Sequence, residues 1–558
     1  MKGFVYTIVL SLVLVLSIVI LRSLSPQREK IATRGRPAPK TPMVVQSDPA
    51  VRSNIDPAEL EKTNLDALYQ TGLELLDLWH VPEAIDVFET LVELDPTRYK
   101  AFLRLVECYS HPTIGAEKQA ASSYERARVA ARAHGGDSLW VSAFHSLFVD
   151  PSPKDAIDRF NRAVKGGGEG VDNRLFLAMA FLMDGRPQDA ERYLADLLDG
   201  DESLGRAREL MVYCEVAKGD YDQAESLAKD LASIYPEEPY PYVLLSRVEL
   251  IRGEVDEAVD FSNNALRLDD RYVPAIVARA HLYVAEGDNE AARVSFEKLL
   301  LFDDAMLSSV GMEGIAYVNF LDGRFDEASD ALDESVRLAM SAESTRRGLV
   351  NAFRHVNYLC ELGRTDAAET VLERWVSRRG DIPYQLGRIR IGISAGRLEE
   401  VRHALDEIED KTEWRTWMRA LGLDFVDFRA LAFIEEKNFN GALDLLNAAG
   451  VQDPGTRRIY LKGFALFHNG NAEEASGLFR QARLRFHGIV FPYHGDPVLY
   501  AQGIFFLAEA ALARGESDEA RQYYGSFLDL WGECDWELQA VARAREKLEA
   551  LSVDSHKG

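Results

Sequence analysis

A short turn sequence recurs along most of the chain, and its spacing limits the folds that the chain can adopt. The motif is a glycine, a few mostly polar residues and then an alanine. It begins at Gly185 (GRPQDA), Gly219 (GDYDQA), Gly253 (GEVDEA) and Gly287 (GDNEAA), each 34 residues after the last. Weaker copies of the motif begin at Trp79, Gly115, Pro151, Gly323, Gly363, Gly396, Lys437, Gly470 and Gly515. A period of this length predicts an array of stacked structural repeats rather than a set of separate globular domains.

The residues after each turn indicate what a repeat is made of. Alanine follows the turn, and a large apolar residue lies four positions later, as at Ala190 and Leu194 or Ala292 and Phe296. In a helix these two positions share one face, and glycine suits the end of the helix before the turn. The pattern therefore predicts two antiparallel helices per repeat, which approach closely at the alanine.

This period and pattern resemble the tetratricopeptide repeat, a helix–turn–helix unit of 34 residues. The resemblance covers roughly Asn64 to Trp531 and is strongest in the four central copies. It implies an all-α fold, a right-handed α-solenoid of about thirteen helical hairpins. It also implies a function in binding proteins or peptides along the concave side of the solenoid.

The sequence divides into five expected segments. They are a transmembrane anchor at 1–21, a basic and then proline-rich flexible linker at 22–57, the repeat solenoid at 58–532, a capping helix at 533–551 and a tail at 552–558. The capping helix has an outer face rich in Arg, Lys and Glu, and it would cover the open end of the last repeat.

The expected anchor is the run from Phe4 to Leu21, eighteen residues without a charge, glycine or proline. As a helix it would be about 27 Å long, close to the hydrocarbon thickness of a bilayer. It predicts a single-pass membrane protein, of the bacterial inner membrane, and a cleaved signal peptide is the alternative. Six basic residues follow the span within about twenty positions. They favour a cytoplasmic over a periplasmic body, with the basic flank against anionic lipid.

The charge balance limits the classes of partner. The chain has 64 Lys and Arg against 90 Asp and Glu, a formal net charge of −26. Nucleic-acid binding needs a basic surface that replaces the counterions around phosphates. We therefore expect protein partners, whose identity the sequence does not reveal, and no nucleic acid.

Motifs for catalysis and metal binding are weak. Ser394 lies in a G-x-S-x-G match at a repeat turn, without the strand and helix that a hydrolase elbow requires. His487, His494 and Asp496 share one loop, with a spacing that matches no strong metal site. The four cysteines are more than a hundred residues apart, so no CxxC pair exists. We expect no enzyme activity, no catalytic residue, no metal and no cofactor.

The candidate binding residues come from the resemblance. In the repeat family the first helix of each repeat lines the concave groove, through a few fixed positions. Here these positions carry aromatic, thioether and mixed polar side chains. The peptide-groove candidates are Leu175, Met179, Arg206, Glu209, Tyr213, Tyr240, Arg247, His281, Glu313 and Tyr317. The alternative is that these side chains pack between adjacent repeats.

Two functions fit these expectations. The first is a membrane-anchored scaffold or adaptor for protein–protein interaction, which binds partner proteins or peptides in the concave groove. The alternative is a regulatory or substrate-presenting subunit of a bacterial envelope-assembly system, to which the expected layout of one span, a basic flank and repeats is similar.

Overall fold

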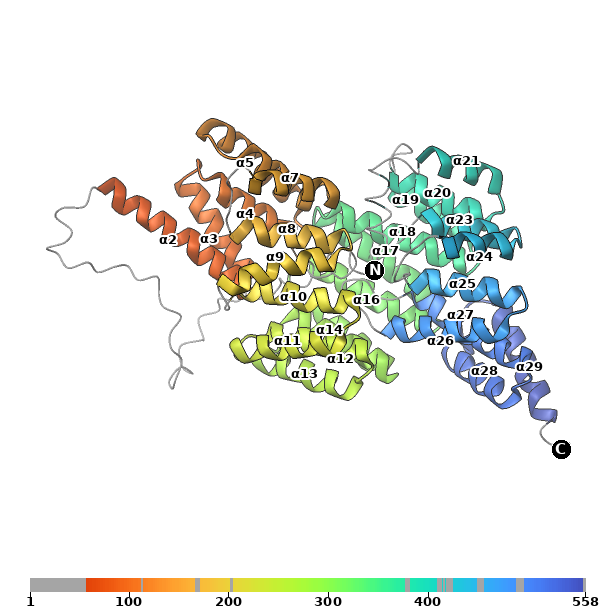
Figure 1. The fold of residues 1–558 in the computed structure, drawn as a ribbon. Coiled ribbons are helices and arrows are strands. Elements are labelled where there is room, and N and C mark those ends of the chain that lie inside the picture. The colour runs from red at the N-terminus through yellow and green to blue at the C-terminus, as the bar shows by residue number, and fades with distance from the viewer. Residues whose placement is uncertain are drawn as a thin grey trace.

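The structure is a computed structural model that describes residues 57–111, 114–165, 171–200, 204–376, 382–408, 414, 417, 425–448, 456–487 and 496–554. Within these ranges every regular element is a helix and none is a strand (Figure 1). The predicted all-α array of helical hairpins is confirmed.

The helices follow one another as antiparallel pairs. The first helices of the pairs are α2 (Pro57–Asp77), α4 (Tyr99–Tyr109), α6 (Ser138–Phe144) with the π-helical η2 (His145–Val149), α8 (Val171–Met183), α10 (Gly205–Lys218), α12 (Pro239–Arg252), α14 (Val273–Glu286), α16 (Ala305–Leu321), α18 (Thr345–Glu361), α20 (Ile382–Ser394), α23 (Phe425–Glu435), α25 (Thr456–His468) and α27 (Pro497–Ala513). The second helices are α3 (Val81–Leu94), α5 (Glu117–His134), α7 (Pro153–Lys165), α9 (Pro187–Gly200), α11 (Tyr221–Ile234), α13 (Val255–Leu268), α15 (Asn289–Glu297) with the 3-10 helix η3 (Lys298–Leu301), α17 (Phe325–Ser341), α19 (Thr365–Trp375), α21 (Leu398–Ile408), α24 (Phe439–Ala448), α26 (Ala472–His487) and α28 (Ser517–Trp531). Helix α29 (Gln539–Asp554) follows the last pair, and each predicted turn lies between the two helices of a pair.

The turns share one backbone conformation. Their glycines, from Gly185 to Gly515, have φ between 70° and 89°, in the left-handed region that glycine adopts without steric cost. Trp79 and Lys437 hold the same turn position with φ of 60° and 59°. A side chain in this conformation costs about 1–2 kcal/mol.

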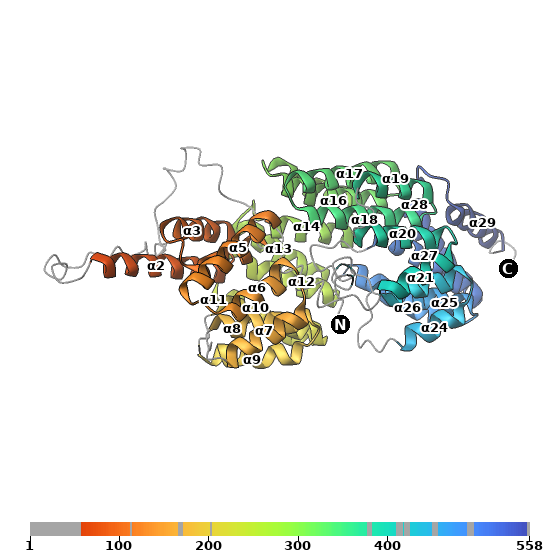
Figure 2. The ribbon, with the colours of Figure 1, turned by 90° about the horizontal axis from the view of Figure 1, so that it is seen from above.

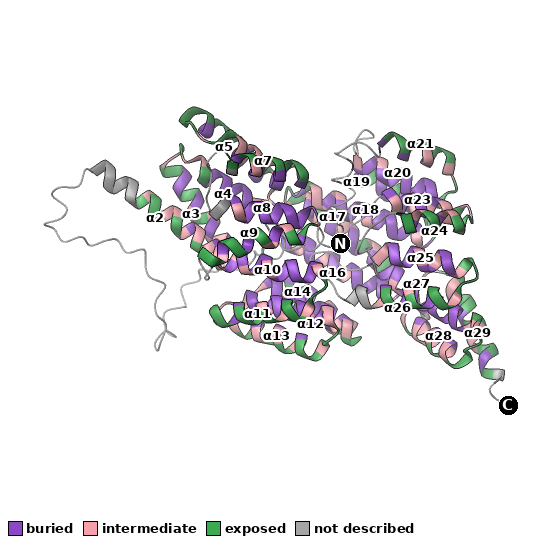
Figure 3. Cartoon of the chain, in the orientation of Figure 1, coloured by how far each residue is buried: buried purple, intermediate pink, exposed green. Residues whose placement is uncertain are grey.

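Close packing within each pair depends on the alanine after the turn. All of these alanines have no exposed surface: Ala84, Ala190, Ala224, Ala258, Ala292, Ala328, Ala442, Ala475 and Ala520. The large apolar residue one helical turn later, such as Phe88 or Leu194, is also fully buried. Figure 3 shows the result, with buried residues where helices meet and exposed residues on the outer helices.

The array curls so that segments far apart in the sequence meet. Helices α2 to α14 form one assembly and α18 to α29 another, with α16 and α17 between them (Figures 1 and 2). The end of α2 contacts α10, and α26 and α27 contact helices α12 to α18. The repeats therefore contact more than their neighbours in sequence.

The N-terminus of α18 is capped by a carboxylate from α5. Ser344, the residue before α18, makes no side-chain capping bond. Glu117 instead accepts two hydrogen bonds from the Arg346 N–H, at 2.9 and 3.1 Å, across 229 residues of sequence. Gly115 lies close to the start of α18, since a Cβ there would lie 2.9 Å from the Ser344 Oγ atom. A carboxylate at this place pairs with free backbone N–H groups and with the helix dipole.

The segment before α29 caps α17 in the same way. The Asp535 carboxylate accepts hydrogen bonds from the N–H groups of Phe325 and Asp326, at 3.0 and 2.9 Å. Beside it the buried Trp531 donates its indole N–H to the Phe320 carbonyl oxygen at 3.0 Å. The C-terminal end of the chain is therefore attached to the central helices by its backbone contacts and its core.

The location predicted from the sequence, a single-pass membrane protein, is contradicted by these helices. In the part of the chain that the structure describes, no helix combines the length and the apolar character needed to cross a bilayer. The longest, α2, carries Asp66, Glu74 and Asp77, and the apolar α16 and α27 are seventeen residues long and contain Glu313 and Glu509. The predicted span itself, Phe4 to Leu21, lies outside the described residues.

Candidate interaction surface

The ten predicted groove residues lie on the first helices of five consecutive pairs, from α8 to α16. We call these ten residues the inner face. Nine of them are buried, with exposed fractions from 0 % for Tyr240 to 9 % for Arg247, and Arg206 is half-buried. The chain itself covers the inner face, because the array curls tightly enough for other helices to reach it.

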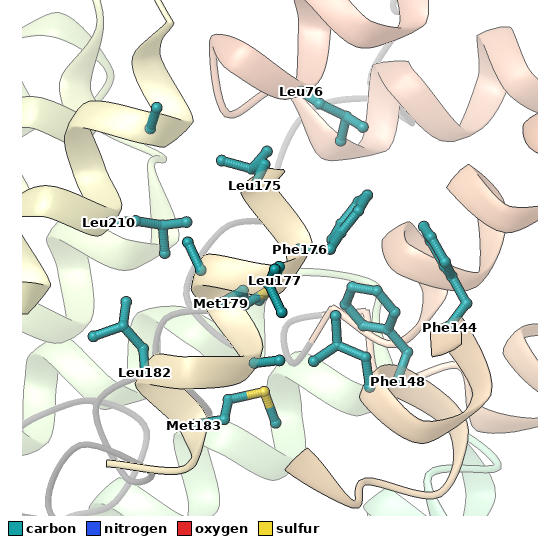
Figure 4. Packing of buried hydrophobic residues seen from close by; sticks show 14 of the residues in the cluster. Leu76, Phe144, Phe148, Leu175, Phe176, Leu177, Met179, Leu182, Met183 and Leu210 are labelled. Atoms are coloured by element: carbon teal, nitrogen blue, oxygen red, sulfur yellow. The ribbon is translucent and has the colours of Figure 1, made fainter. Parts of the chain in front are cut away.

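The apolar end of the inner face packs against the first repeats. Leu175 and Met179 belong to a cluster that also contains Leu76 of α2 and Phe148 of η2, as Figure 4 shows. The Phe148 and Phe176 rings meet edge to face, with centroids 5.8 Å apart. This region is hydrophobic core.

A buried ion triad joins α4 to α10. The Glu107 carboxylate accepts a hydrogen bond from Arg104 at 2.7 Å, and it pairs through its other oxygen with Arg206. Arg104 has no exposed surface, and its guanidinium lies 4.9 Å from the Phe176 ring centroid. Two cations around one carboxylate offset the cost of burying these charges.

Trp79, in the turn between α2 and α3, reaches into the middle of the inner face. Its side chain is buried, and its indole N–H donates to Glu209 Oε2 at 2.6 Å. The Tyr240 hydroxyl donates to Glu209 Oε1 at 2.5 Å, and the Tyr213 and Tyr240 hydroxyl oxygens are 2.9 Å apart. Both oxygens of the Glu209 carboxylate are thus hydrogen-bonded, one of them to a residue 130 positions away.

Aromatic rings hold the Trp79 indole on two sides. Its centroid lies 4.7 Å from that of Tyr240 at a tilted angle, and 5.7 Å from that of Tyr235 in an edge-to-face arrangement. At the start of α10, a Cβ on Gly205 would lie 2.5 Å from the Asp77 carbonyl oxygen. Glycine at this position therefore allows the end of α2 to approach α10.

His80, the next residue, forms an ion pair with α12. Its Nε2 atom lies 2.9 Å from Glu238 Oε2. Burial lowers the pKa of His80, but hydrogen bonds to Glu238 and Glu83 and the charges of these two residues outweigh burial and raise the pKa to about 10. His80 is therefore a cation at neutral pH.

The pKa of Glu209 is also raised, but here the cause is burial. Burial raises the pKa of its carboxyl group to about 7, although hydrogen bonds from Tyr240 and Trp79 and the charges of Arg206 and Arg247 oppose the shift. Near neutral pH, Glu209 therefore exists both as the neutral acid and as the carboxylate.

The other end of the inner face contacts the following repeats. Glu313 of α16 forms ion pairs with Arg347 and Arg354 of α18, and Asn351 Nδ2 lies 3.3 Å from its Oε2 atom. His281 packs edge to face on the ring of Tyr317, with centroids 6.2 Å apart. Burial raises the pKa of Tyr317 above its ordinary value.

The sequence analysis did not single out the residues through which the first repeat meets α10 to α12: Trp79, His80, Tyr235 and Glu238. One signal was present in the sequence. Trp79 occupies the turn position that is glycine in most other copies. A bulky residue at a position that favours glycine indicates that its side chain makes contacts that outweigh the backbone cost.

The residues of the weaker motifs have structural contacts. The Ser394 hydroxyl, at the end of α20, donates to the Cys360 carbonyl oxygen at 3.0 Å. Asp496 caps α27 by accepting the Leu499 N–H at 3.0 Å, and it pairs with Arg457. The side chain of His487 and the whole of His494 lie outside the described residues.

Comparison with known proteins identifies the repeats in two places. Family models described as tetratricopeptide repeats match residues 273–305, which contain α14 and α15, and residues 505–522, in α27 and α28. No curated protein sequence matches the chain. The crystal structure of yeast Tom70 is similar, with 15% identity, coverage of 89% of this chain and 97% of that chain, and a TM-score of 0.26. The crystal structure of the APC/C hetero-tetramer Cut9–Hcn1 is also similar, with 15% identity, coverage of 75% of this chain and 89% of that chain, and a TM-score of 0.25. From the family matches, we conclude that the chain contains tetratricopeptide repeats.

Proposed function

We propose that the chain is a scaffold for protein–protein interaction, and that its inner face is the surface that holds segments of partner proteins. The repeats support this function, because stacked helical pairs present a continuous surface rather than a single reaction centre. Nothing in the described residues favours the envelope-assembly subunit in particular, so we propose the scaffold alone.

One observation carries the proposal. The inner face and the residues beside it already bind a short segment of chain, the turn Trp79–His80. Glu209 and Tyr240 of the inner face contact the indole, and the neighbouring Tyr235 and Glu238 add an aromatic contact and an ion pair. Peptide ligands are held in the same manner, by one or two anchor side chains in pockets with matched polar groups. A partner segment would use contacts of the kind that this turn uses.

The proposal is tested by photo-crosslinking in cells that express the full chain. A photo-crosslinking amino acid replaces either Arg206, a half-buried residue of the inner face, or Arg267, an exposed residue on the outer helix α13. We expect partner proteins to be crosslinked from position 206 and not from position 267. Crosslinks from position 267 alone would place the interaction on the outer helices and reject the inner face.

A further inference from the structure

We propose that the surface of α10 to α12 around Glu209, Tyr235, Glu238 and Tyr240 binds a protein segment in which a tryptophan is followed directly by a basic residue, and that the turn Trp79–His80 fills this site in the closed molecule. The inference rests on the proposed scaffold function and names the chemistry of the partner. It also makes the first repeat a competitor of that partner.

The backbone of the turn is the first argument. Trp79 has a φ of 60°, whereas nine glycines hold the equivalent position with φ of 70° or more. The left-handed conformation disfavours any residue that has a Cβ atom. Lys437 has the same conformation at an exposed turn, but at Trp79 buried contacts of the indole offset the cost of the backbone.

The second argument is the match between the site and an indole. Tryptophan combines a large apolar ring with a single N–H donor. The site supplies the Glu209 carboxylate for the donor, at 2.6 Å, and the rings of Tyr235 and Tyr240 for its edge and face. Phenylalanine lacks the donor, so it would leave a buried carboxylate oxygen without its partner.

The adjacent cation is the third argument. Glu238 precedes α12 and lies 2.9 Å from His80 Nε2, one residue beyond the indole site. A lysine or arginine at the same place in a partner segment could form an ion pair with this carboxylate. Two carboxylates, one for the indole and one for the cation, thus specify the order of the two ligand residues.

The fourth argument is that the turn can be exchanged. The backbone N–H groups of Trp79 and His80 donate to the Leu76 and Leu75 carbonyl oxygens, within their own hairpin. Side chains make the polar contacts with α10 to α12 that we describe, and a partner can copy side chains. Because the turn belongs to the same chain as the site, it binds intramolecularly, and a partner must compete with it.

The test measures binding of a fluorescent peptide to the full chain by anisotropy. The probe copies residues 75–83, LLDLWHVPE. Trp79→Gly removes the internal indole and places glycine at the strained turn. Lys437→Gly is the matched control, since it relieves the same backbone conformation at an exposed turn. We expect Trp79→Gly to bind the probe at least about tenfold more tightly than the natural chain, and Lys437→Gly to bind it as the natural chain does.

Variants of the probe test the ligand chemistry. Replacing its tryptophan by phenylalanine or its histidine by glutamate should weaken binding to the Trp79→Gly chain by about tenfold or more, whereas lysine in place of histidine should preserve binding. Equal binding of the phenylalanine probe, or no binding by a folded Trp79→Gly chain, would refute the proposal.

A second variant covers the case in which Trp79→Gly does not fold. His80→Glu keeps the indole but places a carboxylate against Glu238, so the turn should leave the site and the probe should bind more tightly than to the natural chain. If the His80→Glu chain binds the probe with the affinity of the natural chain, the turn does not compete with the probe and the proposal is refuted. Crosslinks from position 206 together with no binding of any probe would leave the scaffold standing and reject this ligand.

Discussion

The two ends of the repeat array close onto the molecule in different ways. At the N-terminal end, the side chains of Trp79 and His80 contact α10 to α12, and their polar partners are two carboxylates. At the C-terminal end, Trp531 bonds to a backbone oxygen and Asp535 to backbone N–H groups, beside a continuous core. Both closures use tryptophan, but its polar partner is a side chain, Glu209, at the N-terminal end and a backbone oxygen, that of Phe320, at the C-terminal end. Both tryptophans also belong to hydrophobic core clusters, so the two closures differ in their polar partners. Side-chain partners suit exchange, and backbone partners suit permanence.

The largest expected effect is at the C-terminal closure. Trp531→Ala should lower the free energy of unfolding by about 3–5 kcal/mol, because it leaves a cavity and removes the indole hydrogen bond to the Phe320 carbonyl oxygen. Trp79→Gly should cost less, since glycine relieves the backbone of its turn. Chemical denaturation of both variants measures the difference. A larger loss for Trp79→Gly would reverse the comparison.

The N-terminal closure should weaken as the pH rises. The pKa of Glu209 lies at about 7 in the folded chain against an ordinary 4.5, so the folded state keeps a proton that the unfolded chain has released between these values. Stability contributed by this group therefore falls from pH 4.5 to 7, by at most about 1.4 kcal/mol per pH unit. The pKa of His80, raised to about 10, gives the same sign from pH 6.5 to 10.

The variant Glu209→Gln isolates the contribution of Glu209 to the pH dependence of stability. The amide stays neutral, so the variant should lose part of the decline in stability between pH 5 and 7. Glu257→Gln, at an exposed position of α13, is the control and should leave the slope unchanged. Equal slopes for the two variants would show that Glu209 is not the titrating group.

The cap on α17 should contribute a smaller amount. Asp535→Ala removes both hydrogen bonds to the start of α17 and should cost about 1 kcal/mol, the usual value of a helix cap. Hydrogen exchange at Phe325 and Asp326 should become faster. Asp529→Ala, at an exposed position of α28, is the control. Unchanged exchange in Asp535→Ala would mean that the carboxylate does not protect these amides.

The smallest expected effect is a gain in stability. Lys437→Gly should raise the free energy of unfolding by about 1 kcal/mol or less, because Lys437 is exposed and holds a left-handed turn. Replacement of Trp79 by glycine relieves the same backbone conformation but also removes the contacts of the indole. The difference between the two variants therefore measures the indole contacts themselves, and a gain of equal size at both sites would mean that these contacts contribute nothing.

The local part of the fold could be predicted from sequence, and the closures could not. Gly219 and Ala224 determine a turn and a close helix contact within a few residues, so their spacing predicts a hairpin. The resemblance to the repeat family placed Glu209 and Tyr240 on the first helices of their pairs, but it does not give the curvature of the array. Small rotations between successive pairs add up, and their sum decides whether Trp79 reaches a residue 130 positions away.

The distant caps on α17 and α18 have a consequence for the order of folding. Repeat arrays usually have low contact order, so they fold by growth from any point. Here the carboxylate that caps α18 comes from Glu117, which is synthesised well before α18. The carboxylate that caps α17 comes from Asp535, which is synthesised some 210 residues after the start of α17. We expect a nascent chain that ends before Asp535 to hold α18 more firmly than α17, and the finished protein to unfold more cooperatively than a simple stack of repeats.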